Sequence, residues 1–376
     1  MFIVIHYSEI GTKGKNRKDF ENKLITNIQN KLKGLSFKVK RIYGRIILDT
    51  DLDKELIIKK LSKIFGISSF SFAEKSELDI NDIKEKVLIV AKGKTGEIRV
   101  ETKRSNKSFE LKSIEINQKV VEYLFENGFK VNIKNQDHLI NIEICEQNAF
   151  IYDNVYLGLG GLPVGITGKV VCLLSGGIDS PVAGFKLMKR GCNVIFVHFS
   201  NNKQEKNKIL KLIEILSQYQ INTKIYVVDF TELQKEIIAN VDSRYRMLLY
   251  RKFMFKIAEL VAENEQALAL VTGDNLAQVA SQTLENLDVL HSGLKFNVFS
   301  PLIGEDKIDI IKIAQSIGTF ETSIIPYQDC CSFLIDQHPI THAKFDDIHR
   351  FEERIDPKLV LKGFKNAEIR LVKNGM

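Results

Sequence analysis

The stretch "LLSGGIDSPVAG", residues 173–184, has the pattern of a strand that runs through a loop with two glycines into a helix. It continues an apolar run that favours a buried β-strand, and it contains a proline at position 181. Because proline is preferred at the first position of a helix, we expect a helix to begin at Pro181, with Asp179 or Ser180 as its N-cap. The loop between strand and helix then presents backbone N–H groups at the positive end of a helix dipole, an arrangement that binds anions.

Two glycines in this loop, Gly176 and Gly177, allow the backbone to approach a ligand closely. The loop is not a Walker A loop, because G-x-x-x-x-G-K-[ST] is absent, and it is not G-x-G-x-x-G either. An ordinary tight turn is the alternative interpretation. The residues 175–180, which match S-G-G-x-D-S throughout, instead resemble the PP-loop of ATP pyrophosphatases. That resemblance implies cleavage of ATP between its α and β phosphates, but GMP synthetases, NAD synthetases and several tRNA-modifying enzymes share the loop.

Continuous apolar runs recur after a glycine-rich segment near residues 160–168. Such runs are typical of strands in a parallel sheet that is covered by helices on both faces. They lie at 169–174, 193–199, 224–230 and 267–273. We therefore predict an α/β domain with a doubly wound parallel sheet at 166–376, and the glycine-rich segment marks its boundary.

Shorter helical and strand patterns alternate before this boundary. The order strand–helix–strand–strand over residues 2–50 predicts a small ferredoxin-like α+β domain at 1–74, with a further helix that stops at Gly66. A second α+β unit is predicted at 75–165. Its expected elements are helices at about 80–92 and 113–128 and strands at 97–104, 130–133, 139–145 and 148–154.

Basic residues are concentrated near the N-terminus. The net charge is +7, and residues 11–45 contain eleven Lys or Arg against two Asp or Glu. This local excess predicts a phosphate-binding surface, although a solvated lysine-rich face explains the charge alone equally well.

The composition excludes several classes of protein. The apolar run at residues 2–5 is too short for a signal peptide, and no window reaches the ~18 apolar residues of a membrane span, so we expect a cytoplasmic protein without a membrane partner. Five irregularly spaced cysteines without C-x-x-C do not support a disulfide framework, a zinc site or an iron–sulfur site, and no metal ligands are assigned on this basis. Cys145, Cys172 and Cys192 are interpreted as small buried hydrophobes.

Several further stretches resemble the tRNA 4-thiouridine synthetases. They are "GTKGKNR" at 11–17, "FELKSIEIN" at 109–117, "LVTGDNLAQVASQTLENL" at 270–287 and the segment 301–333, which ends in a cysteine-bearing loop. The resemblance covers nearly the whole chain in the family's domain order. It implies a ferredoxin-like domain at 1–74, a THUMP RNA-binding domain at 75–165 and a PP-loop domain of the adenine nucleotide alpha hydrolase type at 166–376.

Two features depart from the family's pattern. Gly273-Asp274-Asn275 stands where many members have Gly-Glu followed by a small residue. Some members also carry a C-terminal rhodanese domain with a second cysteine, and this chain ends at Met376 without room for one. We therefore expect sulfur to arrive from a separate donor and not from a rhodanese cysteine.

The resemblance implies that ATP, with Mg²⁺, adenylates O4 of uridine 8 in tRNA and that AMP leaves when sulfur attacks C4. The residues implied to hold the pyrophosphate are Ser175, Gly176, Gly177, Asp179 and Ser180. The residues implied to contact the rest of ATP are Leu173, Leu174, His198, Phe199, Arg251, Gly273 and Gln282. From the residues alone, His198 would be a core or strand-end histidine.

Three residues are implied to act in catalysis, namely Asp179, Lys307 and Cys330. Asp179 is assigned to Mg²⁺ or to orienting the phosphates, and a purely capping role is the alternative. Lys307 would neutralise charge on the leaving phosphate, and an ordinary surface lysine is the alternative. Cys330 matches the family's catalytic cysteine, which would carry sulfur as a persulfide, while the adjacent Cys331 would resolve or shield it.

The resemblance also gives the basic N-terminal half a role in binding the acceptor end of tRNA, because phosphate contacts position an RNA without reading its sequence. The candidate RNA-binding residues are Lys13, Lys15, Arg17, Lys18, Arg41, Arg45, Lys103, Arg104 and Lys107. Uridine 8 lies within the folded tRNA core, so the base must be exposed before chemistry.

The family resemblance further suggests a cysteine desulfurase as sulfur donor, a homodimer and, in some members, donation of sulfur to thiamine biosynthesis. Two other functions stay open from the sequence. One is a small-molecule PP-loop ATP pyrophosphatase ligase, which would not need the basic upstream region. The other is an RNA-binding protein with a relict ATP site, against which the intact S-G-G-x-D-S argues.

Overall fold

The computed structural model describes residues 1–132, 136–200, 205–326 and 334–373. The chain divides into two compact units, at 1–163 and 164–376, and each is described by itself. No helix within the described ranges is both long enough and apolar enough to cross a membrane.

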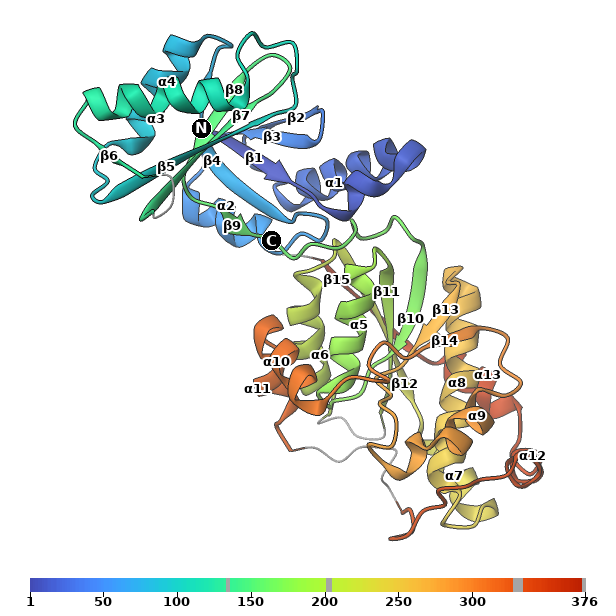
Figure 1. Ribbon diagram of the computed structural model, residues 1–376. Coiled ribbons are helices and arrows are strands. Elements are labelled where there is room, and N and C mark those ends of the chain that lie inside the picture. The colour runs from blue at the N-terminus through green and yellow to red at the C-terminus, as the bar shows by residue number, and fades with distance from the viewer. Residues whose placement is uncertain (133–135, 201–204, 327–333, 374–376) are drawn as a thin grey trace. The chain divides into compact units, whose positions relative to one another are not determined.

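The first unit is built on a nine-stranded sheet with the order β2-β3-β1-β4-β8-β7-β5-β6, and β9 pairs with β4 (Figure 1). Its strands are β1 Phe2–His6, β2 Lys38–Ile42, β3 Arg45–Asp49, β4 Ser69–Ser76, β5 Glu97–Arg104, β6 Lys130–Val131, β7 His138–Ile144, β8 Ala149–Tyr152 and β9 Tyr156–Leu157. Its α-helices are α1 Arg17–Lys31, α2 Lys54–Leu61, α3 Ile80–Ala91 and α4 Ser113–Glu126. One apolar core lies under α1 and α2 and another under α3 and α4, and a smaller cluster forms among side chains of β1, β3, β4 and β8.

The helices of the first unit begin where the sequence offers caps. Asp53 accepts a hydrogen bond from the backbone of Leu56 at the start of α2, and Asp79 caps α3 in the same way. The predicted α+β organisation of this unit is confirmed, and the sheet runs continuously through both predicted domains because β4 pairs with β1 and with β8. The boundary at residue 74 stays a prediction.

The expected role of Gly66 as the stop of a helix is wrong. Helix α2 ends at Leu61, and Gly66 lies beyond it with φ 100°. A Cβ at this position would lie 3.1 Å from Pro163 and 3.2 Å from Leu24, and the Gly66 N–H donates to the carbonyl oxygen of Gly160. The glycine is therefore required by a left-handed backbone and by the close approach of the chain near residue 160.

The second unit contains a six-stranded sheet with the order β14-β13-β10-β11-β12-β15. The first five of these strands are parallel, and β15 is an antiparallel edge strand that the sequence pattern did not predict. The strands are β10 Lys169–Leu173, β11 Asn193–Ser200, β12 Asn222–Asp229, β13 Ala269–Val271, β14 Asn297–Phe299 and β15 Glu368–Lys373. The predicted doubly wound parallel sheet is confirmed.

Helices cover both faces of this sheet (Figure 1). Helices α5 and α6 pack on β10, β11 and β12, and the long α8 packs on β10 and β13. The helices of the unit are α5 Asp179–Lys189, α6 Glu205–Ser217, α7 Thr231–Asn240, α8 Arg246–Glu265, α9 Leu284–His291, α10 Lys307–Ile317, α11 Phe320–Ser323, α12 Phe345–Glu352 and α13 Lys358–Lys365.

The chain runs from β10 to β11 and β12 on one side and returns to β13 and β14 on the other. The carboxyl ends of β10 and β13 therefore form a topological switch point, where ligands bind in sheets of this kind.

A buried carboxylate joins the two halves of the nine-stranded sheet. Glu143 on β7 is 2% exposed, and it accepts hydrogen bonds from Arg45 and from the hydroxyl of Tyr152, the latter at 2.6 Å. The Nε2 atom of His6 lies 2.8 Å from the same carboxylate. Burial alone would raise the pKa of Glu143, but the hydrogen bonds and charges of these partners lower it to about 2.

We expect Glu143→Gln to destabilise the first unit by about 3 kcal/mol, because it leaves the half-buried Arg45 without its counter-ion. Denaturant titration and hydrogen exchange at β1 and β7 measure the effect. Glu74→Gln, at an exposed position on β4, is the matched control and should change the unfolding free energy by less than about 0.5 kcal/mol.

The same carboxylate should make the stability of the first unit depend on pH. Because the folded-state pKa of Glu143 is depressed, its stabilisation is fully present above the unfolded value of 4.5 and is lost as the pH falls toward about 2. The stability difference between wild type and Glu143→Gln should shrink across this window. A difference that stays constant over the same range would contradict the assignment.

Candidate active site

The predicted anion-binding loop lies at the switch point of the second unit, between the end of β10 at Leu173 and the start of α5 at Asp179. The expected helix start at Pro181 is wrong by two residues. The N-cap is Ile178, and no side chain caps the helix, so neither Asp179 nor Ser180 fills the expected capping role. The Asp179 carboxylate is consequently available for contacts outside its own helix.

Two serine hydroxyls fix the shape of this loop. The Ser180 Oγ accepts a hydrogen bond from the backbone of Ser175 at 2.8 Å, and the Ser175 Oγ accepts from the backbone of Gly177 at 3.2 Å. The two hydroxyl oxygens lie 3.1 Å apart. Ser180 is buried and Gly176 is covered as well. The serines thus hold the backbone of the loop, and their predicted contacts with pyrophosphate stay predictions.

The structure brings together two of the three predicted catalytic residues, which are 128 residues apart in the chain. The Lys307 Nζ, at the start of α10, lies 2.5 Å from Oδ1 of Asp179. The second carboxylate oxygen accepts a hydrogen bond from Gln278 at 3.0 Å. Gln278 was not predicted as a site residue, although it lies within the stretch 270–287 that carries the family resemblance. Both partners of the ion pair are partly exposed, so the pair can be reached by a ligand.

Gly273 follows β13 and packs directly on the first turn of α5. A Cβ at this position would lie 2.7 Å from the backbone nitrogen of Ser180 and 2.9 Å from the carbonyl carbon of Asp179. These distances are shorter than any that a real Cβ tolerates next to backbone atoms. The absence of a side chain at 273 is therefore what allows the two loops at the switch point to meet.

A buried ion pair holds the segment that follows Gly273. Asp274 is 4% exposed, and both of its carboxylate oxygens accept hydrogen bonds from Arg251 Nη2 at 2.7 Å. Gln282 Nε2 donates to the same carboxylate at 3.0 Å. Burial would raise the pKa of Asp274, but the charge of Arg251 and the hydrogen bonds keep it below its usual value. Two of the predicted ATP contacts, Arg251 and Gln282, thus converge on Asp274, which directly follows Gly273 and was not predicted as a site residue.

The four residues predicted on the adenosine side lie at the ends of β10 and β11. His198 is 3% exposed, and its Nδ1 lies 2.9 Å from the carbonyl oxygen of Leu174. Phe199 is buried and packs edge-to-face on Phe230, while Leu173 is half-buried. His198 is therefore a buried strand-end histidine, as the residues alone suggested, and contact of this group with adenosine stays a prediction.

The cysteine predicted to carry sulfur, Cys330, lies with Cys331 outside the described residues. The three described cysteines are buried, as expected for small hydrophobes. Burial raises the pKa of the Cys172 thiol to about 12 and also raises the pKa of Cys145 and Cys192. These three side chains are therefore thiols at neutral pH and poor nucleophiles.

The predicted RNA-binding residues all lie in the first unit, but they differ in what they contact. Arg45 pairs with the buried Glu143, and Arg104 donates to the backbone carbonyl oxygens of Leu111 and Lys107. These two guanidinium groups hold the fold of their own unit. The residues Lys15, Lys18, Arg41, Lys103 and Lys107 are exposed, whereas Lys13 and Arg17 are half-buried.

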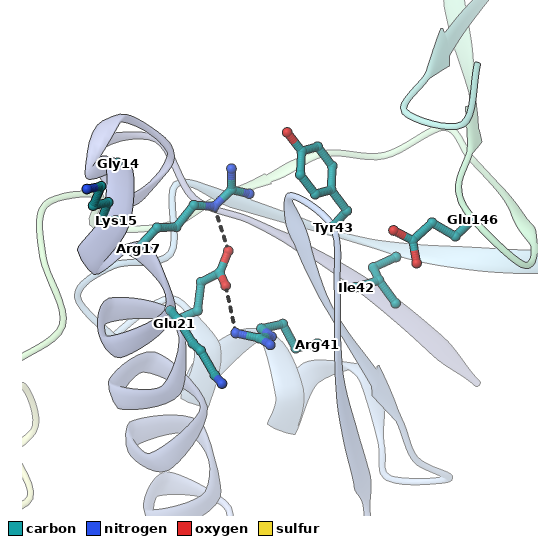
Figure 2. A pocket seen from close by; sticks show the side chains of 9 residues that line it. Gly14, Lys15, Arg17, Glu21, Arg41, Ile42, Tyr43 and Glu146 are labelled. Carbon is teal, nitrogen blue, oxygen red and sulfur yellow. Dashed lines mark hydrogen bonds and ion pairs between the residues drawn. The ribbon is translucent and has the colours of Figure 1, made fainter. Parts of the chain in front are cut away.

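Four of these basic residues line a hollow of about 480 Å³ near α1 (Figure 2). They are Lys15, Arg17, Lys18 and Arg41. The remaining lining residues include the side chains of Glu21, Tyr43 and Glu146. The basic surface predicted from charge alone is therefore concave at this point.

Known proteins and family models match this chain over nearly its whole length. Residues 165–356 match the family model of the thiamine biosynthesis protein ThiI, residues 2–71 match the ThiI ferredoxin-like domain, and residues 77–154 match the THUMP domain. The chain is 42% identical to a probable tRNA sulfurtransferase of Thermoanaerobacter pseudethanolicus, over 98% of this chain and 99% of the relative. A probable tRNA sulfurtransferase of Moorella thermoacetica is 37% identical over 98% of this chain and 97% of its own length.

Two solved structures are also similar to this chain. A 4-thiouridine synthetase, crystallised as an RNA complex with bound ATP, is 36% identical and superimposes with a TM-score of 0.90 over 99% of both chains. A protein of Pyrococcus horikoshii is 28% identical, with a TM-score of 0.67, over 84% of this chain and 99% of its own.

The close approach of Gly273 to α5 predicts the effect of a single methyl group. We expect Gly273→Ala to separate the two loops, to cost about 2 kcal/mol of stability in the second unit, and to weaken ATP binding. Thermal unfolding and calorimetric titration with ATP measure these two effects.

Gly304→Ala is the matched control, because a Cβ there meets no atom within 4 Å. It should leave both the thermal midpoint and the ATP affinity unchanged. Equal ATP affinity in the Gly273→Ala variant and in wild type would show that the packing of the two loops does not matter for the nucleotide.

Proposed function

Because this chain belongs to the tRNA sulfurtransferase (ThiI) family, we propose that it forms 4-thiouridine at position 8 of tRNA with ATP as the activating co-substrate. The observation that carries the proposal is the Asp179–Lys307 ion pair beside an anion-binding loop at the switch point. The related 4-thiouridine synthetase that was crystallised with RNA and ATP supports it. The experiment that tests it is the formation of AMP, pyrophosphate and 4-thiouridine from ATP, a sulfur donor and unmodified tRNA.

The first step is adenylation of the uridine. O4 attacks the α phosphorus of ATP, the bond between the α phosphorus and the bridging oxygen breaks, and pyrophosphate leaves. Backbone N–H groups of the loop at 175–178 and the positive end of α5 would stabilise the pyrophosphate. Lys307, whose ammonium group lies at Asp179, would neutralise the charge that develops on the leaving group.

Mg²⁺ fits this site through Asp179. Its carboxylate is partly exposed and offers the oxygen ligands that Mg²⁺ prefers, and Mg²⁺ commonly binds one or two carboxylates together with substrate phosphates. When bound, the ion would supply positive charge to the phosphates. Asp179 would hold the ion, and Lys307 would act on the phosphates.

The second step is transfer of sulfur to C4. We propose that Cys330 carries a persulfide whose terminal sulfur attacks C4, while the C4–O4 bond breaks and AMP leaves with that oxygen. An external thiol then cleaves the sulfur–sulfur bond, which releases 4-thiouridine and leaves a disulfide on Cys330 for a further thiol to reduce. The described cysteines are unsuited to this role, because all three are buried.

The exposed lysines and arginines of the first unit would hold the acceptor end of the tRNA, and a cysteine desulfurase would load the sulfur. Assembly as a homodimer and a contribution of sulfur to thiamine biosynthesis belong to the same proposal.

Membership of the family favours this function over a small-molecule PP-loop ligase and over an RNA-binding protein with a relict ATP site. Stimulation of pyrophosphate release by tRNA would separate it from both.

We expect Asp179→Asn to lower the rate of AMP and pyrophosphate formation by about 10²-fold or more, because the variant loses the charge that engages Lys307 and Mg²⁺. Its affinity for tRNA should not change. Asp309→Asn is the control, since Asp309 lies on α10, is exposed and pairs with Lys312 on the surface. Wild-type rates of AMP formation in Asp179→Asn would remove Asp179 from the mechanism.

We expect Cys330→Ser to form AMP and pyrophosphate but not 4-thiouridine, because a serine cannot hold sulfane sulfur. Cys331→Ser is the adjacent control and should keep much of its activity. Single-turnover thiolation of an unmodified tRNA transcript, with a desulfurase as donor, measures the difference. Full thiolation by Cys330→Ser would favour direct attack by sulfide.

A further inference from the structure

The hollow beside α1 contains a carboxylate in a place where a surface for nucleic acid should have none. Glu21 on α1 is 5% exposed and lines the hollow together with four basic residues (Figure 2). A negative charge here should repel RNA, and a buried carboxylate is unfavourable unless it is paired. Its contacts explain why it is tolerated.

Glu21 binds two guanidinium groups, one through each carboxylate oxygen. Arg17 Nε donates to Oε1 at 2.7 Å, and Arg41 Nη1 donates to Oε2 at 3.2 Å (Figure 2). The hydroxyl of Tyr7 donates to Oε1, and it accepts a hydrogen bond from Arg17 Nη2 at 2.8 Å. One carboxylate therefore fixes two arginines that lie on different elements, α1 and β2.

The two arginines keep donors for a ligand. A guanidinium carries five N–H donors, and the contacts above use two from Arg17 and one from Arg41. Lys15 and Lys18 are exposed on the same hollow. The ring of Tyr43, which is 65% exposed, lies 5.1 Å from Cζ of Arg17 and restricts that side chain from the other side.

We propose that Glu21 is a positioning residue that holds Arg17 and Arg41 in a fixed geometry for a phosphodiester of the substrate RNA. This inference rests on the proposed function, because it takes the ligand of the hollow to be RNA. A phosphate oxygen suits the planar, forked donors of arginine, and donors that are already held in place lose less entropy on binding. Glu21 does not touch the RNA and acts through the two arginines.

The direction in which Glu21→Gln changes the affinity for RNA tests the proposal. If Glu21 contributed only charge, Glu21→Gln would remove a negative group and strengthen RNA binding. As a positioning residue, its replacement should weaken binding of an unmodified tRNA transcript about tenfold, because the amide of glutamine keeps only one acceptor oxygen and leaves one of the two guanidinium groups without its anchor. The slope of log affinity against log salt should also become flatter by about one.

Glu146→Gln is the matched control, since Glu146 lines the same hollow but is exposed. That variant should bind RNA as tightly as wild type or up to about twofold more tightly, because it removes repulsion only. If Glu21→Gln strengthens RNA binding as Glu146→Gln does, the positioning role is wrong.

A second variant covers the case in which Glu21→Gln does not fold, as judged by circular dichroism. Arg41→Lys keeps the charge at an exposed side chain but removes the planar fork. It should weaken RNA binding severalfold, whereas unchanged affinity would show that only net charge matters.

The proposed role of Glu21 and the proposed function can fail independently of each other. A wild-type protein that thiolates tRNA, together with unchanged RNA affinity in both variants, would overturn only the role of Glu21. A wild-type protein that does not thiolate tRNA, together with weaker RNA binding in both variants, would overturn the proposed reaction and leave the phosphate site in place.

Discussion

The crossover at β10 is the constraint on which the candidate active site depends. The chain leaves β10 toward β11 and returns to β13 on its other side, so two loops that are about a hundred residues apart in sequence meet at one edge of the sheet. They meet closely only because residue 273 has no side chain. This contact brings the loop with Asp179 next to the segment with Asp274 and Gln278, and α10 adds Lys307. Ligands bind at this place in doubly wound sheets, and here it carries Asp179, Gln278 and Lys307.

Buried carboxylates that hold arginines recur in both units. Asp274 binds Arg251, Glu143 binds Arg45, and Glu21 binds Arg17 together with Arg41. A buried ion pair adds little net stability, but breaking one is costly, so its main effect is to fix geometry. In each case the carboxylate and an arginine that it holds come from different segments of the chain. These buried acids thus set the positions of arginines that the sequence predicted as ligand-binding.

Much of the fold could be predicted from the sequence, because the signals are local. The apolar runs at β10, β11 and β12 predicted parallel strands, and S-G-G-x-D-S predicted the anion-binding loop between β10 and α5. The predicted start of α5 was wrong because Ile178 already has helical backbone angles. The proline at position 181 gives no sign that the helix begins before it. Asp274, Gln278 and Glu21 were missed for a different reason. Their roles depend on partners brought close by tertiary structure, and no periodicity or spacing in one sequence shows such pairs.

We propose that this chain activates uridine by transferring AMP to O4, and the fate of that oxygen distinguishes this route from others. A tRNA transcript with ¹⁸O at O4 of uridine 8 is incubated with ATP, Mg²⁺ and a sulfur donor, and the AMP is analysed by mass spectrometry. Adenylation predicts one ¹⁸O atom in the phosphate of AMP for each 4-thiouridine that is formed. AMP without ¹⁸O, or cleavage of ATP to ADP, would contradict transfer of AMP to O4.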